Sequence, residues 1–149
     1  MPEPAPPGRS ARERLPQLCV GAVARRGREL LMVRRGNEPG RGLWSVPGGR
    51  VEWGETVRHA VERELAEETS LEGTCGDLVG WTEVMTPREH FVVLDHEVTL
   101  TGDDRPTAGS DATEAAWMDL EALSELPVVP GLVEFLERHG ILGPPHPRP

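Results

Sequence analysis

Three glutamates, Glu64, Glu67 and Glu68, stand at the positions i, i+3 and i+4 of the chain. On an α-helix this spacing stacks their carboxylates on one face. Like charges four residues apart destabilise a helix, so the arrangement is costly unless a ligand binds there. A divalent cation removes that cost, because hard Mg²⁺ binds a few carboxylate oxygens together with substrate phosphates. The spacing therefore indicates either a magnesium–phosphate site or a solvated acidic helix face.

A helix must position these carboxylates, and the sequence predicts one that begins at Glu55–Thr56 and ends near Thr69. Three apolar residues recur at helical spacing and form its buried stripe: Val57, Val61 and Leu65. Gly48 and Gly49 precede the helix, and because they lack a Cβ their backbone can come close to a metal ion or phosphate. The glycine turn and the acidic helix together favour the metal–phosphate interpretation.

The run from Gly49 to Leu71 resembles the signature of the Nudix hydrolases, which ends in Arg-Glu-aliphatic-x-Glu-Glu-x-Gly-aliphatic. Eight of the nine specified positions are filled as in that family, by Gly49, Glu55, Arg63, Glu64, Leu65, Glu67, Glu68 and Leu71. The exception is Ser70, where the family usually has a glycine that ends the helix in the left-handed conformation. The resemblance extends to 42–48 and 114–117, and so covers most of residues 17–142.

This resemblance implies an α/β/α Nudix sandwich with a mixed β-sheet, and an Mg²⁺-dependent hydrolase in which Mn²⁺ is an alternative ion. It implies four metal ligands: the Gly48 carbonyl and the carboxylates of Glu64, Glu67 and Glu68. Ions held there would bridge a pyrophosphate and activate a water for in-line attack on phosphorus. Glu64 is the first candidate to orient or deprotonate that water, and Glu97 and Glu114 are the alternatives.

Catalysis is expected to depend on Glu64, Glu67 and Arg63. The carboxylates of Glu55 and Glu67 surround Arg63 in the helical arrangement. We therefore expect its guanidinium to hold the glutamate side chains through forked hydrogen bonds.

Three residues outside the helix are expected to bind substrate: Arg34, Trp44 and Glu114. Arg34 stands at the end of a predicted strand, where it could reach phosphate or ribose, although a solvated surface arginine fits the pattern better. Trp44 offers either a π face for a nucleobase or an anchor for the core, and the sequence leaves both interpretations open.

The size and charge of the chain restrict its class. A length of 149 residues suits one domain with a proper core. The formal net charge of −9 argues against a nucleic-acid polymer as partner. Seven acids and two bases between Glu52 and Glu72 leave −5, so an anionic substrate would need cations to approach. Neither a membrane-spanning run nor a signal-peptide core is found, so we expect a cytoplasmic protein without a membrane partner.

Proline-rich segments at 1–16 and 143–149 are expected to be disordered tails around a single domain at 17–142. Strands are predicted at 19–24, 29–34, 44–46, 79–85 and 91–101, and further helices at 120–126 and 132–139. Because strands and helices interleave irregularly, they indicate a mixed sheet flanked by helices, in the α/β (α+β) class.

The signature implies a small-molecule substrate, a nucleoside diphosphate linked to another group, and leaves that group open. Pro87 and the segment 108–115 resemble features of ADP-ribose-hydrolysing relatives, and the chain has no tyrosine, which dinucleoside polyphosphate hydrolases typically carry. ADP-ribose or a related nucleotide sugar is therefore the leading substrate. The first alternative is a (d)NTP pyrophosphohydrolase that cleanses the nucleotide pool, and the second is a non-catalytic ligand sensor. Homodimer formation is also left open.

Overall fold

The computed structural model describes residues 15–143. The predicted disordered tails, 1–16 and 143–149, lie almost entirely outside the described residues, so the boundaries of the domain at 17–142 stay a prediction. No helix within the described part of the chain is long and apolar enough to cross a membrane.

Four strands form the sheet next to the acidic helix, which we call sheet A. Their spatial order is β5 (Gly48–Arg50), β1 (Gln17–Val23), β7 (His90–Leu100) and β6 (Gly73–Met85). Strands β1 and β7 run parallel, whereas β5 and β6 are antiparallel to their neighbours. Sheet A is therefore mixed, as predicted.

A second sheet, sheet B, is built around one central strand. Its strands are β2 (Arg25–Arg26), β3 (Glu29–Arg35), β4 (Trp44–Ser45) and β8 (Ala112–Asp119). All three partners run antiparallel to β3. The sequence analysis predicted β3 and β4 but assigned no strand to the segment of β8.

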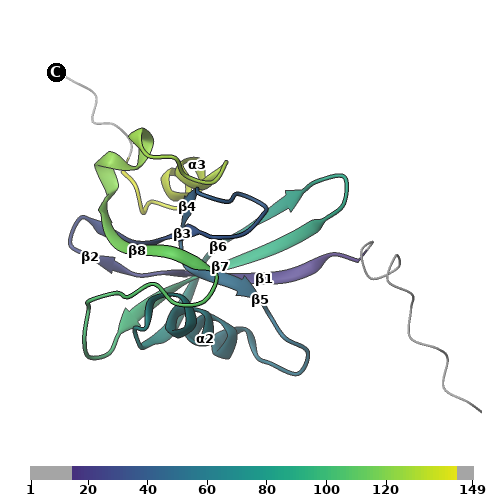
Figure 1. The fold of residues 1–149 in the computed structure, drawn as a ribbon, viewed down its shortest axis with the longest axis horizontal. Coiled ribbons are helices and arrows are strands. Elements are labelled where there is room, and N and C mark those ends of the chain that lie inside the picture. Colours follow the sequence, from purple (N-terminus) through teal and green to yellow (C-terminus); the bar gives the residue numbers. More distant parts are fainter. Residues whose placement is uncertain (1–14, 144–149) are drawn as a thin grey trace, which may run out of the picture.

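The helices lie on opposite sides of the strands, with α2 (Val57–Thr69) on one side and α3 (Leu132–Arg138) on the other (Figure 1). The segment Leu120–Glu125 is a 3₁₀ helix, η1, where the sequence predicted an ordinary helix. Two hydrophobic clusters fill the layers. The buried face of α2 packs with β1 residues such as Val20, while Phe135 and Leu136 of α3 pack with Leu30 and Met32 of β3. The α/β/α sandwich is thus confirmed.

Local sequence explains both ends of α2. At the N-terminus the Thr56 hydroxyl accepts a hydrogen bond from the backbone N–H of His59 at 3.1 Å, as an N-cap does. At the C-terminus Ser70 adopts the left-handed conformation, with φ 63°, and its N–H donates to the Ala66 carbonyl at 2.9 Å. Serine therefore occupies the conformation that the family glycine would take, and the predicted helix ends at Thr69 as expected.

The loop between β7 and β8 satisfies the last carbonyls of α2. The N–H groups of Thr107 and Gly109 donate to the carbonyls of Thr69 and Glu68, at 2.8 and 3.0 Å. The Ser70 hydroxyl donates to the Thr107 carbonyl at 3.2 Å. Since orphan carbonyls at a helix end need such partners, the loop fixes the end of α2 that carries the acidic residues.

Candidate active site

The acidic face of α2 lies against β5. A Cβ on Gly49 would overlap the carboxylate of Glu64, so only glycine leaves this space to the glutamate. The Glu64 side chain is 12% exposed, whereas that of Glu67 is 47% exposed. The burial of Glu64 raises the pKa of its carboxyl, in spite of the opposing effect of Arg63.

Arg63 uses all five of its N–H donors. A forked pair from Nε and Nη2 reaches the two Glu55 oxygens at 2.7 and 2.9 Å. Nη1 donates to Glu64 at 2.9 Å and to Glu67 at 3.2 Å, and Nη2 also donates to the Arg50 carbonyl at 3.0 Å. The forked contact expected from the sequence is present, and it fixes the orientation of two of the three glutamates.

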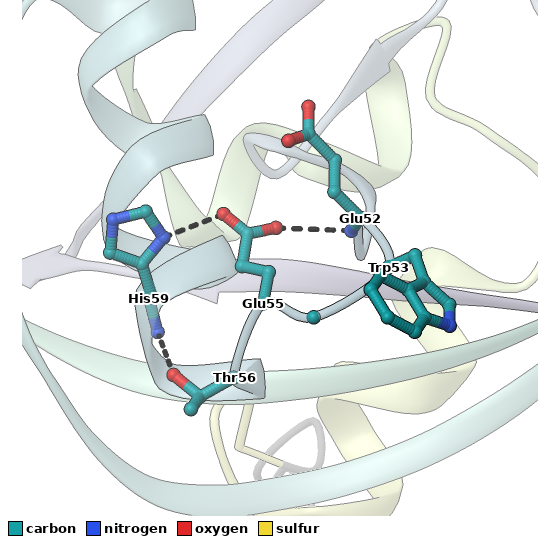
Figure 2. Close-up of a pocket in the computed structure, with 6 residues that line it drawn as sticks. Glu52, Trp53, Glu55, Thr56 and His59 are labelled. Atoms are coloured by element: carbon teal, nitrogen blue, oxygen red, sulfur yellow. Dashed lines mark hydrogen bonds and ion pairs between the residues drawn. The ribbon is translucent and has the colours of Figure 1, made fainter.

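Glu55 stands at the N-terminus of α2, where its carboxylate meets the ring of His59 at 2.6 Å and accepts the Glu52 N–H at 3.1 Å (Figure 2). Its hydrogen bonds with Arg63 are the main cause that lowers the pKa of Glu55 to about 2. Glu55 therefore stays ionised under all ordinary conditions and serves as the fixed counter-charge of Arg63.

Glu68 has a different environment. Its carboxylate accepts the N–H of Gly48 at 3.0 Å. Burial raises the pKa of Glu68 to about 8, and the nearby charge of Glu64 adds to the rise. The positive charge of Arg35 lowers the pKa of Glu68, whereas the negative charge of Asp111 raises it further. The carboxylate thus lacks sufficient positive charge around it.

The donor set fits a hard divalent cation. Carboxylates are the ligands that Mg²⁺ and Mn²⁺ prefer, and the uncompensated charge of Glu68 close to Glu64 favours a cation on this face of α2. Within residues 15–143, no three acidic, histidine or cysteine side chains converge as a ready metal cage. Glu64 and Glu67 instead point to Arg63.

A recess of about 450 Å³ lies beside this cluster at the start of α2 (Figure 2). It is lined by Glu52, Trp53, Gly54, Glu55, Thr56 and His59. Trp53 is fully exposed on its rim, while Glu55 points inward to His59. None of the three clustered glutamates lines the recess.

The predicted substrate-binding residues have other partners in the structure than Glu64, Glu67 and Glu68. Arg34 pairs with Glu114 across β3 and β8 at 3.5 Å, and its Nε donates to the Gly42 carbonyl at 3.0 Å. Trp44 is 6% exposed and packs in the core cluster that contains Phe135. Of its two interpretations, the structure supports the core anchor.

Glu97 and Pro87, two other residues that the sequence analysis singled out, also have partners in the structure. Glu97 forms an exposed ion pair with Arg25 at 3.4 Å. Pro87 lies in the turn between β6 and β7, where the Thr86 hydroxyl accepts the N–H groups of Arg88 and Glu89. These contacts are those of ordinary surface and turn residues.

Sequence reasoning missed Asp95, which is 7% exposed in the middle of β7. Burial raises the pKa of Asp95 to about 6, in spite of the opposing effect of His96. The signal that could have found it is the number of glycines in the adjacent strands, such as Gly21 and Gly80.

Comparison with known proteins agrees with this geometry. The model of the NUDIX domain matches residues 15–139 of the chain. An ADP-ribose pyrophosphatase of Methanocaldococcus jannaschii is 35% identical over 113 residues, which are 74% of this chain and 66% of that protein. A putative 8-oxo-dGTP diphosphatase 2 of Mycobacterium tuberculosis is 44% identical over 70 residues, which are 44% of this chain and 50% of that protein. The chain thus spans about two thirds or less of these two relatives.

Among solved structures, the MutT NUDIX hydrolase of Burkholderia pseudomallei superimposes with a TM-score of 0.75 at 26% identity. The match covers 83% of this chain and 98% of that one. The similarity therefore extends over the whole fold and includes both helical layers.

Proposed function

The chain belongs to the Nudix hydrolase family, whose members are pyrophosphatases that act on nucleotides, and on that premise we propose that it cleaves the diphosphate of a nucleotide sugar, with ADP-ribose as the leading substrate. One observation carries the proposal. Arg63 holds the carboxylates of Glu64 and Glu67 on the same face of α2 on which Gly48 holds Glu68. Such a set of oxygen donors suits phosphate chemistry assisted by a divalent cation.

We assign Glu64, Glu67, Glu68 and the Gly48 carbonyl as the groups that hold Mg²⁺ or Mn²⁺. When bound, such an ion supplies Lewis-acid stabilisation of the phosphate oxygens. Arg63 holds two of the carboxylates next to each other, which restricts their positions before substrate arrives. Glu64, buried and with a raised pKa, is our candidate for the group that takes a proton from the attacking water.

The choice of ADP-ribose rests on the extent of similarity. The match to the archaeal ADP-ribose pyrophosphatase spans 74% of this chain, beyond the signature. The match to the putative 8-oxo-dGTP diphosphatase is closer in identity but spans 44% of the chain. That high local identity supports hydrolysis of a nucleoside triphosphate as the second candidate.

The test is turnover of the purified chain with Mg²⁺ or Mn²⁺, offered ADP-ribose, nucleotide sugars and (d)NTPs in parallel. We expect AMP and ribose 5-phosphate from ADP-ribose, and loss of turnover with EDTA. Release of pyrophosphate from a triphosphate, without cleavage of ADP-ribose, would instead support the second candidate function, hydrolysis of a nucleoside triphosphate. Binding without turnover across the whole panel would favour a ligand sensor.

A matched pair of variants links that turnover to the glutamates. Glu67→Gln removes one charge from the cluster and is expected to lower kcat by roughly 10²–10³-fold. Glu72→Gln makes the same chemical change at an exposed position just after α2 and should leave kcat unchanged. Equal activity of the two variants would contradict the assignment.

A further inference from the structure

One row of residues crosses all four strands of sheet A. Gly48 of β5 pairs with Gly21 of β1, Gly21 pairs with Asp95 of β7, and Asp95 pairs with Gly80 of β6. Three of these four positions have no side chain, so Asp95 carries the only one in the row. Because side chains alternate along a strand and Gly49 faces α2, the neighbouring Gly48 and its row face the other side of the sheet.

The glycines on both sides of Asp95 are required by what lies over them. A Cβ on Gly21 would overlap Oδ1 of Asp95 and would also come within 3.2 Å of the Val46 side chain. A Cβ on Gly80 would overlap the ring of His139, which follows α3. The Asp95 carboxylate therefore lies flat over β1 in a space that the sequence keeps free of other side chains.

This carboxylate has no partner. Asp95 is 7% exposed, yet no group within residues 15–143 donates a hydrogen bond to it. Every fully buried polar side-chain atom in the described part of the chain has a hydrogen-bond partner. The two Asp95 oxygens must therefore retain some access from outside. A buried carboxylate without donors is unfavourable, and such groups call for a functional explanation.

We propose that Asp95 is a substrate-binding residue that accepts hydrogen bonds from two neighbouring donors on the nucleoside part of the substrate. The donors are the vicinal hydroxyls of a ribose or the amino and imino groups of a base. This inference rests on the proposed function, because it assumes a nucleotide whose phosphates bind beside Glu68. It goes further than the proposed function by naming a residue that binds the nucleoside part of the substrate.

The position of Asp95 in the sheet suits that task. Gly48, whose N–H holds Glu68, lies two strands away from Asp95, which corresponds to roughly 10 Å at the usual strand spacing. That separation is on the scale of one nucleotide. Gly21, between them in the row, has no side chain, and this leaves the space over β1 to the Asp95 carboxylate. Raised pKa values from burial, such as that of Asp95, also concentrate at functional sites.

The experiment measures KM and kcat for ADP-ribose with Asp95→Asn and Asp95→Ala in the full chain. A lost hydrogen bond to a charged acceptor predicts a KM roughly 10- to 100-fold higher, with kcat nearly unchanged. Asp95→Asn keeps the shape of the side chain and removes a buried charge, so this variant is expected to fold. Asp77→Asn, at an exposed acid of β6, is the matched control and should keep the wild-type KM.

Substrate analogues identify the donors. If Asp95 binds ribose, 2′-deoxy and 3′-deoxy forms of the substrate bind the wild type less well but lose nothing more in Asp95→Ala. If it binds a base, replacing the amino-bearing base has that effect and the deoxy forms do not. Either non-additive result supports the proposal.

The proposal is overturned if both Asp95 variants keep the wild-type KM for a nucleotide that the wild type hydrolyses. Wild-type inactivity on the whole panel counts against the proposed function instead. In that case calorimetry with the methylene analogue of ADP-ribose still tests Asp95. Weaker binding by the variants would support its role, and equal binding would overturn it.

Discussion

The two faces of sheet A hold two carboxylates whose pKa values shift in opposite directions. On the α2 face the Glu55 side chain is 7% exposed, within a half-buried residue, and its pKa falls to about 2. On the other face the whole residue Asp95 is 7% exposed and its pKa rises to about 6. The difference lies in Arg63, which gives Glu55 two short hydrogen bonds, whereas no described residue donates one to Asp95. The hydrogen bonds from Arg63 therefore account for the low pKa of Glu55, and burial without a donor accounts for the raised pKa of Asp95.

The comparison separates two uses of a buried acid. On the α2 face the charges of Arg63 and Glu55 compensate each other within the protein, and Arg63 also holds Glu64 and Glu67 in place. On the opposite face the compensation is missing and must come from outside. The first arrangement contributes to stability, while the second lowers it in exchange for a binding group.

The largest effect should come from removing the partner on the α2 face. Arg63→Ala leaves Glu55 buried without a counter-charge, so the free energy of unfolding should fall by about 3–5 kcal/mol. Chemical denaturation measures it. Arg28→Ala, which breaks an exposed pair with Glu121, is the control and should change stability by less than about 1 kcal/mol. Similar losses in the two variants would remove the distinction between buried and exposed pairs.

On the opposite face, removing the charge of Asp95 should increase stability. The pKa of Asp95 rises from 3.8 when unfolded to about 6 when folded, so the folded state binds more protons between these values. Stability therefore falls as pH rises from 3.8 to about 6 and keeps that loss at higher pH. Asp95→Asn should raise the free energy of unfolding by about 3 kcal/mol at pH 8 and by almost nothing below pH 4.

Measuring the unfolding of wild type and Asp95→Asn across pH 3.5–8 checks this difference. Glu55 has the reverse dependence, since its folded pKa is lowered from 4.5 to about 2 and its contribution disappears as pH falls through that range. A stability difference between the Asp95 proteins that does not vary with pH would show that its charge is not responsible.

Two glycine substitutions compare the faces directly. Gly49→Ala drives a methyl group into Glu64 and Gly21→Ala drives one into Asp95, so each should lower stability by about 1–3 kcal/mol. Their kinetic effects should differ. Gly49→Ala displaces Glu64, the proposed catalytic group, and should reduce kcat roughly 10²-fold, while Gly21→Ala should act mainly on KM. A fall in kcat of the same size in both variants would contradict separate roles for the two faces.

The smallest effect is expected at the C-terminus of α2. Ser70→Gly removes the strain of a left-handed serine, about 1 kcal/mol, but loses the hydrogen bond to Thr107 and makes the unfolded chain more flexible. These effects oppose one another, so thermal unfolding should show a net change below about 1 kcal/mol, with unchanged kcat. A larger gain would mean that the serine is a defect in the site.

Regular local patterns made most of the fold predictable. The helix from Thr56 to Thr69 followed from its cap and apolar stripe, and β7 followed from its alternation. By contrast β8 was missed, because its strand character depends on pairing with β3, which lies far away in the sequence. Strand β6 begins at Gly73, earlier than predicted, and contains irregular register shifts near Leu78 that weaken any periodic signal.

The site was predictable to the extent that it is local. The contacts of Arg63 with Glu55 and Glu67 all arise within one helix and its entry turn. Asp95 could not be recognised, because its burial depends on β1, β6 and α3 coming together around it. For the same reason the pairing of Arg34 with Glu114 was not foreseen, since it depends on the register of β3 with β8.

The loop that closes the end of α2 has a consequence for how such a protein can diversify. Thr107 and Gly109 bind the helix through backbone N–H groups. Any residue other than proline can supply the N–H at position 107, whereas position 109 needs glycine because a Cβ there would overlap the Glu67 carbonyl. Most side chains of this loop are thus unconstrained by the helix they anchor, and mutations can accumulate there without disturbing the glutamates. A lineage could alter this segment in length and chemistry, and so acquire new substrates, while the reaction itself is inherited unchanged.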